Sequence, residues 1–252
     1  MSVFVAYRKE WLELIRSHRL LVVAVVLVFF GLTSPLFAKF TPEIITLLPG
    51  GEEISKIIPT PTVWDAISQY VKNLGQFGII LALLLTMGAI AQEKDKGTAA
   101  MMLVKPLPRG AFLAAKFIAL GSMFAVALAA AGIACYYYTL LLFESMNLLH
   151  WLLLNLLIFV YVMVFVALTL FCSTITKSQA AAGGIALGLM IFLGLIGAIP
   201  GLGKYLPGEL ITWGVRLMQG DLTASWTALG VSFGLIVVPL LAAWLIFERQ
   251  EL

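Results

Sequence analysis

Charged residues are scarce in this sequence of 252 residues. Lysine, arginine, aspartate and glutamate together make up 12% of the chain, whereas hydrophobic residues make up 62%. A soluble domain carries about 25% charged residues and about 45–50% apolar residues. Because there are too few charges to cover a water-facing surface, most of the surface must face lipid. The composition therefore predicts a helical membrane protein with several spans, and the net charge of +3 is too small to indicate a nucleic-acid partner.

Cysteine and histidine are also rare, at two residues each. In the topology given below, Cys135 and Cys172 fall near opposite faces of the membrane. A disulfide needs Cα atoms within about 7 Å of one another, so we expect both cysteines to be free and to pack as small apolar residues. His18 and His150 also fall at opposite faces, which disfavours a zinc site and hence an intramembrane metalloprotease.

Six apolar runs are each long enough to cross a bilayer, whose hydrocarbon core requires roughly 20 apolar residues. Acidic and basic residues are missing from the middle of all six runs, and this argues against a carrier coupled to ions or protons. The third run is longer than a span requires, so we expect its first turns to project from the membrane or its axis to tilt. The predicted membrane helices are 20–38, 74–91, 112–143, 148–171, 179–199 and 229–247.

An even number of spans places both termini on one side of the membrane. Lysine and arginine in short loops favour the cytoplasmic side. Eleven of the 16 lysines and arginines lie on the side of the termini, and five lie on the other. We therefore expect an all-α membrane protein with six transmembrane helices and both termini in the cytoplasm.

Residues 2–18, which precede the first span, show the period of a helix. Their larger apolar residues recur at steps of three and four, and most of the charges fall elsewhere on the helical wheel. An amphipathic helix with tryptophan and tyrosine on its apolar side is suited to the plane of the membrane interface. A simple basic flank that orients the next helix is the alternative. The apolar positions are Phe4, Tyr7, Trp11, Leu14 and Ile15.

The stretch 92–116, between the second and third spans, holds seven charged residues. The count of basic residues places it in the cytoplasm. Thr98 can cap a short helix that follows it, and Pro106 ends that helix because the residue before a proline is pushed out of helical geometry. A short rigid element can transmit a push, which a flexible linker cannot. We therefore predict that residues 92–111 form a cytoplasmic loop through which a partner moves the membrane helices; the alternative is that the charges only orient and solvate the loop.

This loop is not accompanied by a nucleotide-binding or catalytic motif in the sequence. The segment GLGK at 201–204 departs from a phosphate-binding loop, since Ala198 stands at the position of the first glycine and Tyr205 follows the lysine. The chain is therefore expected to be no enzyme and to bind no cofactor or metal of its own. The energy for any movement must arrive from another chain.

The charged stretch resembles the membrane subunits of ABC-2-type transporters. In that family an acidic–basic cluster leads into Gly-Thr, a short apolar helix, a proline, a basic residue and a lysine that opens the next span. The N-terminal YRKEWLELIRSHR also looks like the elbow helix of the family, and the resemblance covers essentially the whole chain. The residues of the stretch that match are Glu93, Gly97, Thr98, 99–104, Pro106, Arg109 and Lys116.

This resemblance implies a permease subunit of an ABC-2-type exporter in the bacterial cytoplasmic membrane. Two copies, as a homodimer, would form the pathway, and a separate ATPase subunit would bind ATP and magnesium. The residues implied to contact the ATPase are Glu93, Lys94, Asp95, Gly97, Thr98, Met101, Met102, Leu103, Pro106 and Arg109. The outer stretch 200–228 would supply short re-entrant or gate helices, with Trp213, Val215 and Met218 as gate residues.

A second hypothesis belongs to a different class. The same loop would serve a membrane protein that transports nothing and only docks or regulates a cytoplasmic partner, such as a sensor or an immunity component. Under the first hypothesis, the lack of polar residues in the spans favours a hydrophobic or amphipathic cargo such as a lipid, a peptide or a drug.

Overall fold

The computed structural model describes residues 3–47, 49, 59–95, 108–143 and 145–249. Within these ranges the chain forms helices and no strand. Six helices are long and apolar enough to cross a membrane. The predicted fold class, an all-α membrane protein with six spans, is confirmed.

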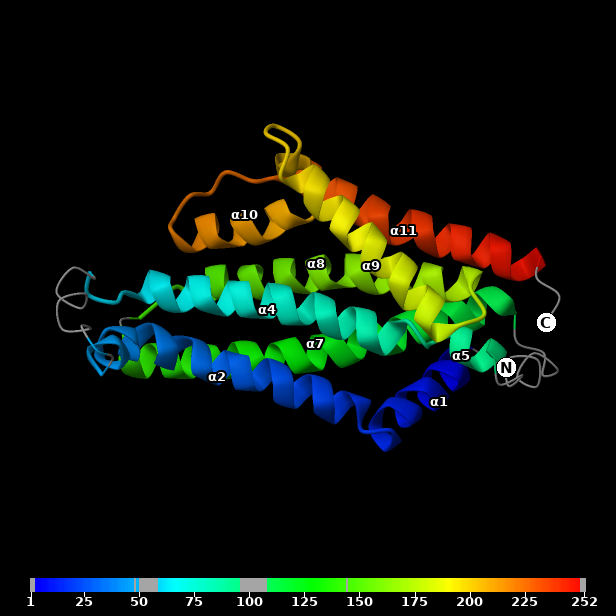
Figure 1. Ribbon diagram of the computed structural model, residues 1–252, viewed down its shortest axis with the longest axis horizontal. Coiled ribbons are helices and arrows are strands. Elements are labelled where there is room, and N and C mark those ends of the chain that lie inside the picture. The colour runs from blue at the N-terminus through cyan, green and yellow to red at the C-terminus, as the bar shows by residue number, and fades with distance from the viewer. Residues whose placement is uncertain (1–2, 48, 50–58, 96–107, 144, 250–252) are drawn as a thin grey trace.

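The N-terminal helix α1 (Val3–Arg16) meets the first span, α2 (Arg19–Thr46), at a sharp bend (Figure 1). His18 forms this bend with a φ of 59°. The span α2 continues past its predicted end at residue 38 and contains two prolines, Pro35 and Pro42. Hydroxyl groups beside these prolines, on Ser34 and Thr41, donate to carbonyls four residues earlier. These bonds satisfy the two hydroxyl groups within the apolar helix, one residue before each proline.

The second span, α4 (Val63–Thr86), begins well before its predicted start at residue 74. Thr62 and Asp65 form a capping box, in which the Thr62 amide and hydroxyl both donate to Asp65 Oδ2, at 2.7 and 2.8 Å. This box defines the start of the helix. After Thr86 the chain makes a turn over residues 87–90 and then forms the short helix α5 (Ala91–Asp95).

The third and fourth spans are α7 (Arg109–Leu142) and α8 (Leu148–Ile175). The Asn147 side chain caps α8 by accepting hydrogen bonds from the amides of residues 149 and 150. Helix α8 lies at the centre of the bundle and contacts α4, α7, α9, α10 and α11. This position explains why it is the most deeply buried of the six spans.

The C-terminal part of the chain contains α9 (Gln179–Gly197), the 3-10 helix η1 (Gly203–Tyr205), α10 (Gly208–Met218) and α11 (Trp226–Arg249). The helices η1 and α10 lie in the stretch 200–228, where short re-entrant or gate helices were expected, and their part in a gate stays a prediction. The connection from α9 to α10 lies part-way along the bundle, whereas α2 and α4 extend further (Figure 1).

The core lies between α2, α4, α7 and α8. Helices α2 and α7 approach so closely that a Cβ atom added at Gly31 would lie 2.5 Å from the Ala131 carbonyl oxygen. Across the core, the Tyr70 hydroxyl of α4 donates to Asn155 Oδ1 of α8 at 2.5 Å. This bond accounts for the asparagine within an apolar span. Both cysteines are buried and free, as predicted.

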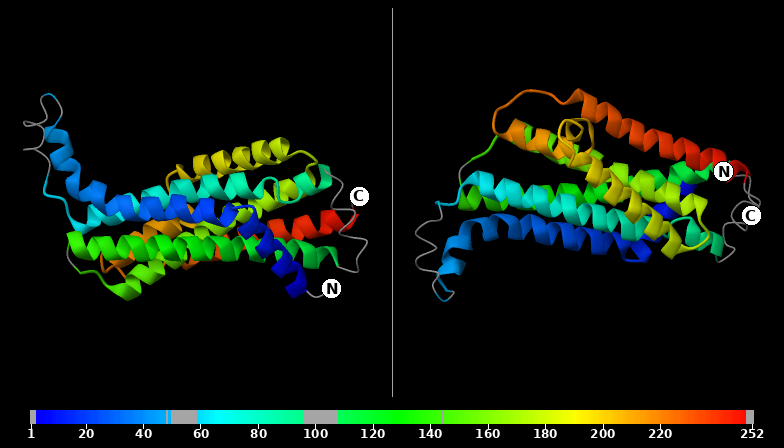
Figure 2. Two further views of the ribbon diagram at one scale, coloured as in Figure 1. Left: turned by 90° about the horizontal axis from the view of Figure 1, so that it is seen from below. Right: turned by 45° about the horizontal axis from the view of Figure 1, so that its top comes forward.

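The described ends of the chain lie at the same end of the bundle as α5 and the start of α7 (Figures 1 and 2). This arrangement follows from six spans that alternate in direction. We call this end of the bundle the terminal end.

Candidate functional site

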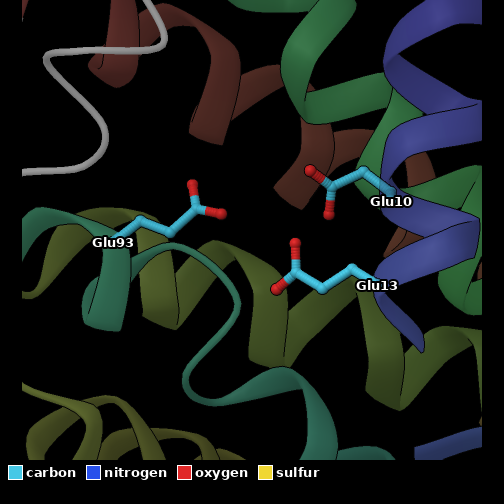
Figure 3. Close-up of side chains that lie close together, drawn as sticks. All are labelled: Glu10, Glu13 and Glu93. Atoms are coloured by element: carbon cyan, nitrogen blue, oxygen red, sulfur yellow. The ribbon is translucent and has the colours of Figure 1, made fainter. Parts of the chain in front are cut away.

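Charged side chains from three helices meet at the terminal end of the bundle. The Lys116 side chain of α7 is 4% exposed, and its Nζ atom lies 2.9 Å from Glu10 Oε2 of α1 and 2.8 Å from Glu93 Oε1 of α5. The Nζ atom of Lys9 lies 3.0 Å from Glu10 Oε1, 3.4 Å from Glu13 Oε2 and 3.9 Å from Glu93 Oε1. We call these five residues the ionic cluster; Figure 3 shows its three carboxylates turned toward one another.

The helical period explains how α1 brings a carboxylate into this cluster. Its buried face consists of Ala6, Glu10 and Leu14, which follow one another at steps of four residues. Glu10 is therefore buried between Ala6 and Leu14 on this face and does not face water. On the other side, the Lys116 ammonium lies 4.9 Å from the centroid of the Phe112 ring one turn earlier in α7. The cluster thus joins α1, α5 and α7.

Electrostatics keep Glu10 and Lys9 ionised within this cluster. Burial alone would raise the pKa of Glu10, but the ammonium groups of Lys116 and Lys9 outweigh burial and hold that pKa below its ordinary value of 4.5. Burial alone would lower the pKa of Lys9, and the carboxylates of Glu10, Glu93 and Glu13 outweigh it and raise the pKa above 10.5. Both groups are therefore charged at neutral pH.

Three carboxylates this close together also invite the question of a metal site. Oxygen atoms of Glu10, Glu13 and Glu93 lie within 4.8 Å of one another. A cavity of about 40 Å³ adjoins them and is also lined by Arg19 and Lys116. Lys9 and Lys116 already contact these carboxylates, and Arg19 is nearby. A metal cation would therefore be repelled by these positive charges, or would have to displace the ammonium groups from the carboxylates. The charge balance favours an ion-pair network that joins helices.

Basic residues on either side of residues 96–107 contact the ends of two other spans. Lys94 of α5 donates to the Thr174 carbonyl of α8, and its Nζ lies 5.6 Å from the centroid of the Phe247 ring. Arg109, the first residue of α7, donates from Nη1 to the carbonyls of Phe247 and Glu248 in α11, at 2.5 and 3.0 Å. These carbonyls belong to the last turns of their helices, where a positive charge is favourable.

The turn between α4 and α5 is also attached to α8. The Ser173 hydroxyl oxygen accepts hydrogen bonds from the amides of Ile90 and Ala91, at 3.0 Å each, and donates to the Met87 carbonyl at 2.9 Å. A Cβ atom added at Gly88 would lie 3.1 Å from the Gln179 side chain, so this turn also packs against the start of α9. A displacement of α5 would therefore move α8 and α9 as well.

The residues predicted to contact a partner fall into three groups. Glu93, Lys94 and Arg109 form contacts within the chain itself, which the sequence did not indicate. Asp95, the last residue of α5, has an exposed side chain. The remaining predicted residues lie outside the described ranges; they are Gly97, Thr98, Met101, Met102, Leu103 and Pro106.

The predicted gate residues lie on α10. Trp213 and Met218 are buried, and Val215 is half-buried. The Trp213 ring packs edge-to-face on the Trp226 ring of α11, with centroids 5.7 Å apart. A Cβ atom added at Gly214 would lie 2.4 Å from Leu154 Cδ1, so α10 packs tightly on α8. The three residues predicted to form a gate thus belong to a helix that packs on other helices of the same chain.

Sequence reasoning missed the pairing of Lys116 with Glu10. One signal was present in the N-terminal residues, since Glu10 follows Ala6 and precedes Leu14 at steps of four. A carboxylate on the same face as two apolar residues indicates a buried partner of opposite charge. The predicted apolar face shares Leu14 with the buried face. Its other members are Phe4 and Ile15, which are exposed, and Tyr7 and Trp11, which are half-buried.

Comparison with known proteins gives two matches over nearly the whole chain. A family model described as "ABC-2 family transporter protein" matches residues 4–252. The chain is also 28% identical over 258 aligned residues to a Bacillus subtilis (strain 168) protein described as "uncharacterized transmembrane protein YxlG". That alignment covers 100% of this chain and 99% of the relative.

Proposed function

The chain belongs to the ABC-2 family of transporter proteins, and from this membership we propose that it is the permease subunit of an ABC exporter. It is a multi-pass bacterial membrane protein, and its role is transport and not catalysis. In this proposal two copies of the chain form the pathway, and a separate ATPase subunit that binds ATP and magnesium drives it. The terminal end of the bundle faces the cytoplasm, in line with its excess of lysine and arginine.

One observation supports the coupling of this chain to an ATPase above all others. The described residues on both sides of residues 96–107 are attached to other helices. Before that segment, Glu93 joins α5 to α1 through Lys9 and to α7 through Lys116, and Lys94 joins it to α8. After it, Arg109 joins α7 to α11. A force applied to this segment would therefore reach most of the membrane helices.

The proposed mechanism uses these attachments in sequence. ATP binding closes the dimer of ATPase subunits, and the docked cytoplasmic loops of the two permease copies move with them. Because the ionic cluster and the Ser173 contacts connect α5 to α1, α7 and α8, the helices of each copy tilt together and do not bend one by one. The two halves then open toward the outside, where α10 would take part in the gate.

A variant of Asp95 tests the docking surface. Reversing the charge of Glu93 or Arg109 would break contacts within the chain, so the effect on docking could not be separated from the effect on folding. Asp95 is exposed. If it pairs with a basic residue of the ATPase, as this proposal has it, Asp95→Lys should weaken the association by on the order of tenfold, because the pair becomes two like charges. Glu43→Lys, at an exposed position of α2 far from the terminal end, is the matched control (Figure 1).

The measurement is co-purification with each candidate ABC ATPase of the same organism, followed by ATP hydrolysis in reconstituted vesicles. An ATPase that binds the native chain and the Glu43 variant, but binds the Asp95 variant weakly, is the expected result. If every candidate ATPase fails to bind the native chain, the permease proposal is wrong. If an ATPase binds but drives no flux of any amphipathic cargo tested, the alternative of a docking or regulatory protein is favoured.

A further inference from the structure

A cavity of about 570 Å³ lies beside α8, between α4, α9 and the connection from α9 to α10. Its volume falls within the range of roughly 300–1,000 Å³ that is typical of pockets for small molecules. Tyr161 and Phe165, near the middle of α8, line one part of it, and η1 borders another. The cavity therefore extends from the middle of α8 to the end of α9, the shortest of the six candidate spans.

The wall formed by the membrane helices is mostly apolar, with the Tyr161 hydroxyl as its polar group. Ile79 of α4, Phe165 of α8, and Met190 and Leu193 of α9 all line the cavity. A Cβ atom added at Gly194 would meet no heavy atom within 4 Å, which shows that the space beside α9 is open. Such a wall suits an alkyl or acyl chain, whose burial away from water is favourable.

Lys204, at the rim of the cavity near η1, forms no ion pair with a carboxylate of the described ranges. Glu209 also lines the cavity, but its Oε1 atom lies 2.7 Å from Arg216 Nη2 and 3.1 Å from the Ser225 hydroxyl oxygen. The Lys204 side chain is exposed, and its contact within the described residues is with the Tyr205 ring, at 5.0 Å from the centroid. The rim is therefore positive next to an apolar wall.

We propose that this cavity binds a single-chain anionic amphiphile, with its chain along α9 and its head group at Lys204. A phosphate, sulfate or carboxylate head is attracted by the ammonium, and a quaternary ammonium head is repelled. The inference deepens the proposed function, because the ligand would be the class of substrate that the permease exports. Binding itself requires no ATPase, so this proposal is tested on the purified chain alone.

The probe is radiolabelled dodecyl phosphate, added to the chain in phosphatidylcholine nanodiscs. Empty nanodiscs measure how much probe partitions into lipid. The expected result is saturable binding above this background, which unlabelled dodecyl phosphate displaces and dodecyltrimethylammonium does not. Because no ATPase is present, the result stands whether or not the chain proves to be a permease.

Two pairs of variants locate the site. Gly194→Leu fills the cavity and should abolish saturable binding, whereas Gly184→Leu, on the same helix and also in open space, should bind as the native chain does. Lys204→Gln should lower the affinity about fivefold, the effect of one basic side chain on an anionic lipid. Lys72→Gln, an exposed lysine that lines a different cavity, should leave the affinity unchanged.

Three outcomes would overturn the proposal. The first is the lack of saturable binding above empty nanodiscs, as expected if a second copy of the chain covers the cavity. The second is undiminished binding to the Gly194 variant, which would place the ligand elsewhere. The third is equal displacement by the cationic amphiphile or equal affinity in the Lys204 variant, which would remove the role of charge.

Discussion

Replacing Lys116 by methionine is expected to release α1 from the bundle. Methionine is a flexible side chain that fills similar space, but it removes the ammonium that contacts both Glu10 and Glu93. Losing one partner of a buried ion pair costs about 3–5 kcal/mol, because the other charge stays buried without compensation. Lys9 still contacts both carboxylates from a more exposed position, so we expect the lower end, about 3 kcal/mol.

The assay is hydrogen exchange of the α1 amides in nanodiscs, which reports local opening of a helix. A loss of about 3 kcal/mol corresponds to exchange on the order of 100-fold faster, since 1.4 kcal/mol is a factor of ten. Lys177→Met makes the same chemical change at an exposed site between α8 and α9 and should leave α1 unchanged. The triple variant Glu10→Gln, Glu93→Gln, Lys116→Met should regain most of the protection, because no buried charge is left unpaired.

Unchanged exchange of α1 in the Lys116 variant would refute the reasoning, since the cluster would then not attach α1. Equally fast exchange in the single and triple variants would show that an unpaired buried charge is not the cause of the opening of α1, and that lost packing of the Lys116 side chain is. In the first case α1 stays docked, so transport by a permease that couples through α1 would also be expected to persist in the Lys116 variant.

Two further predictions concern pH and packing. The pKa of Glu10 is lowered on folding. Its contribution to α1 docking is therefore present above the ordinary value of 4.5 and is lost as pH falls through the lower folded pKa. The pKa of Lys9 is raised on folding, so its contribution persists up to at least pH 10.5. A spin label at Ile15, an exposed position of α1, should therefore keep constant mobility between about pH 5 and 9 and become mobile in acid; a change centred near neutral pH would contradict this. Gly31→Ala should destabilise the bundle by about 1–3 kcal/mol or more, because the added Cβ would meet a backbone oxygen that cannot turn away. Thermal unfolding in detergent measures this effect, and Gly184→Ala, in open space, should be neutral or slightly stabilising; equal melting temperatures for the two variants would be inconsistent with close packing of α2 on α7.

Hydropathy was sufficient to predict the number and approximate position of the spans. A bilayer offers no hydrogen-bond partners, so a long apolar run has to form a helix. The ends of the helices were harder to predict because local polar contacts set them. The Thr62–Asp65 box starts α4 early, and α2 continues beyond residue 38 despite Pro42. The even number of spans predicted that both termini lie together, and the described ends of the chain lie at one end of the bundle. Charge counting assigned this end to the cytoplasm, which stays a prediction.

The candidate site could be predicted only in part. The sequence directed attention to Glu93, Lys94 and Arg109 as charged residues beside a predicted coupling helix, and it interpreted them as contacts for a partner. The structure shows that each also contacts another helix of the same chain. Nothing in a linear pattern reports that the Phe247 carbonyl lies next to Arg109, because the two residues are 138 positions apart.

The sequence by itself determined that this chain is a six-span helical membrane protein with a charged loop between its second and third spans. That information is local: it resides in apolar runs of bilayer length and in the distribution of lysine and arginine. Only the tertiary structure decided that Lys116 joins Glu10 to Glu93 and that an open cavity with a positive rim lies beside α9. Both depend on how helices distant in sequence pack, and packing is decided by the shapes and charges of side chains that meet only in the folded bundle.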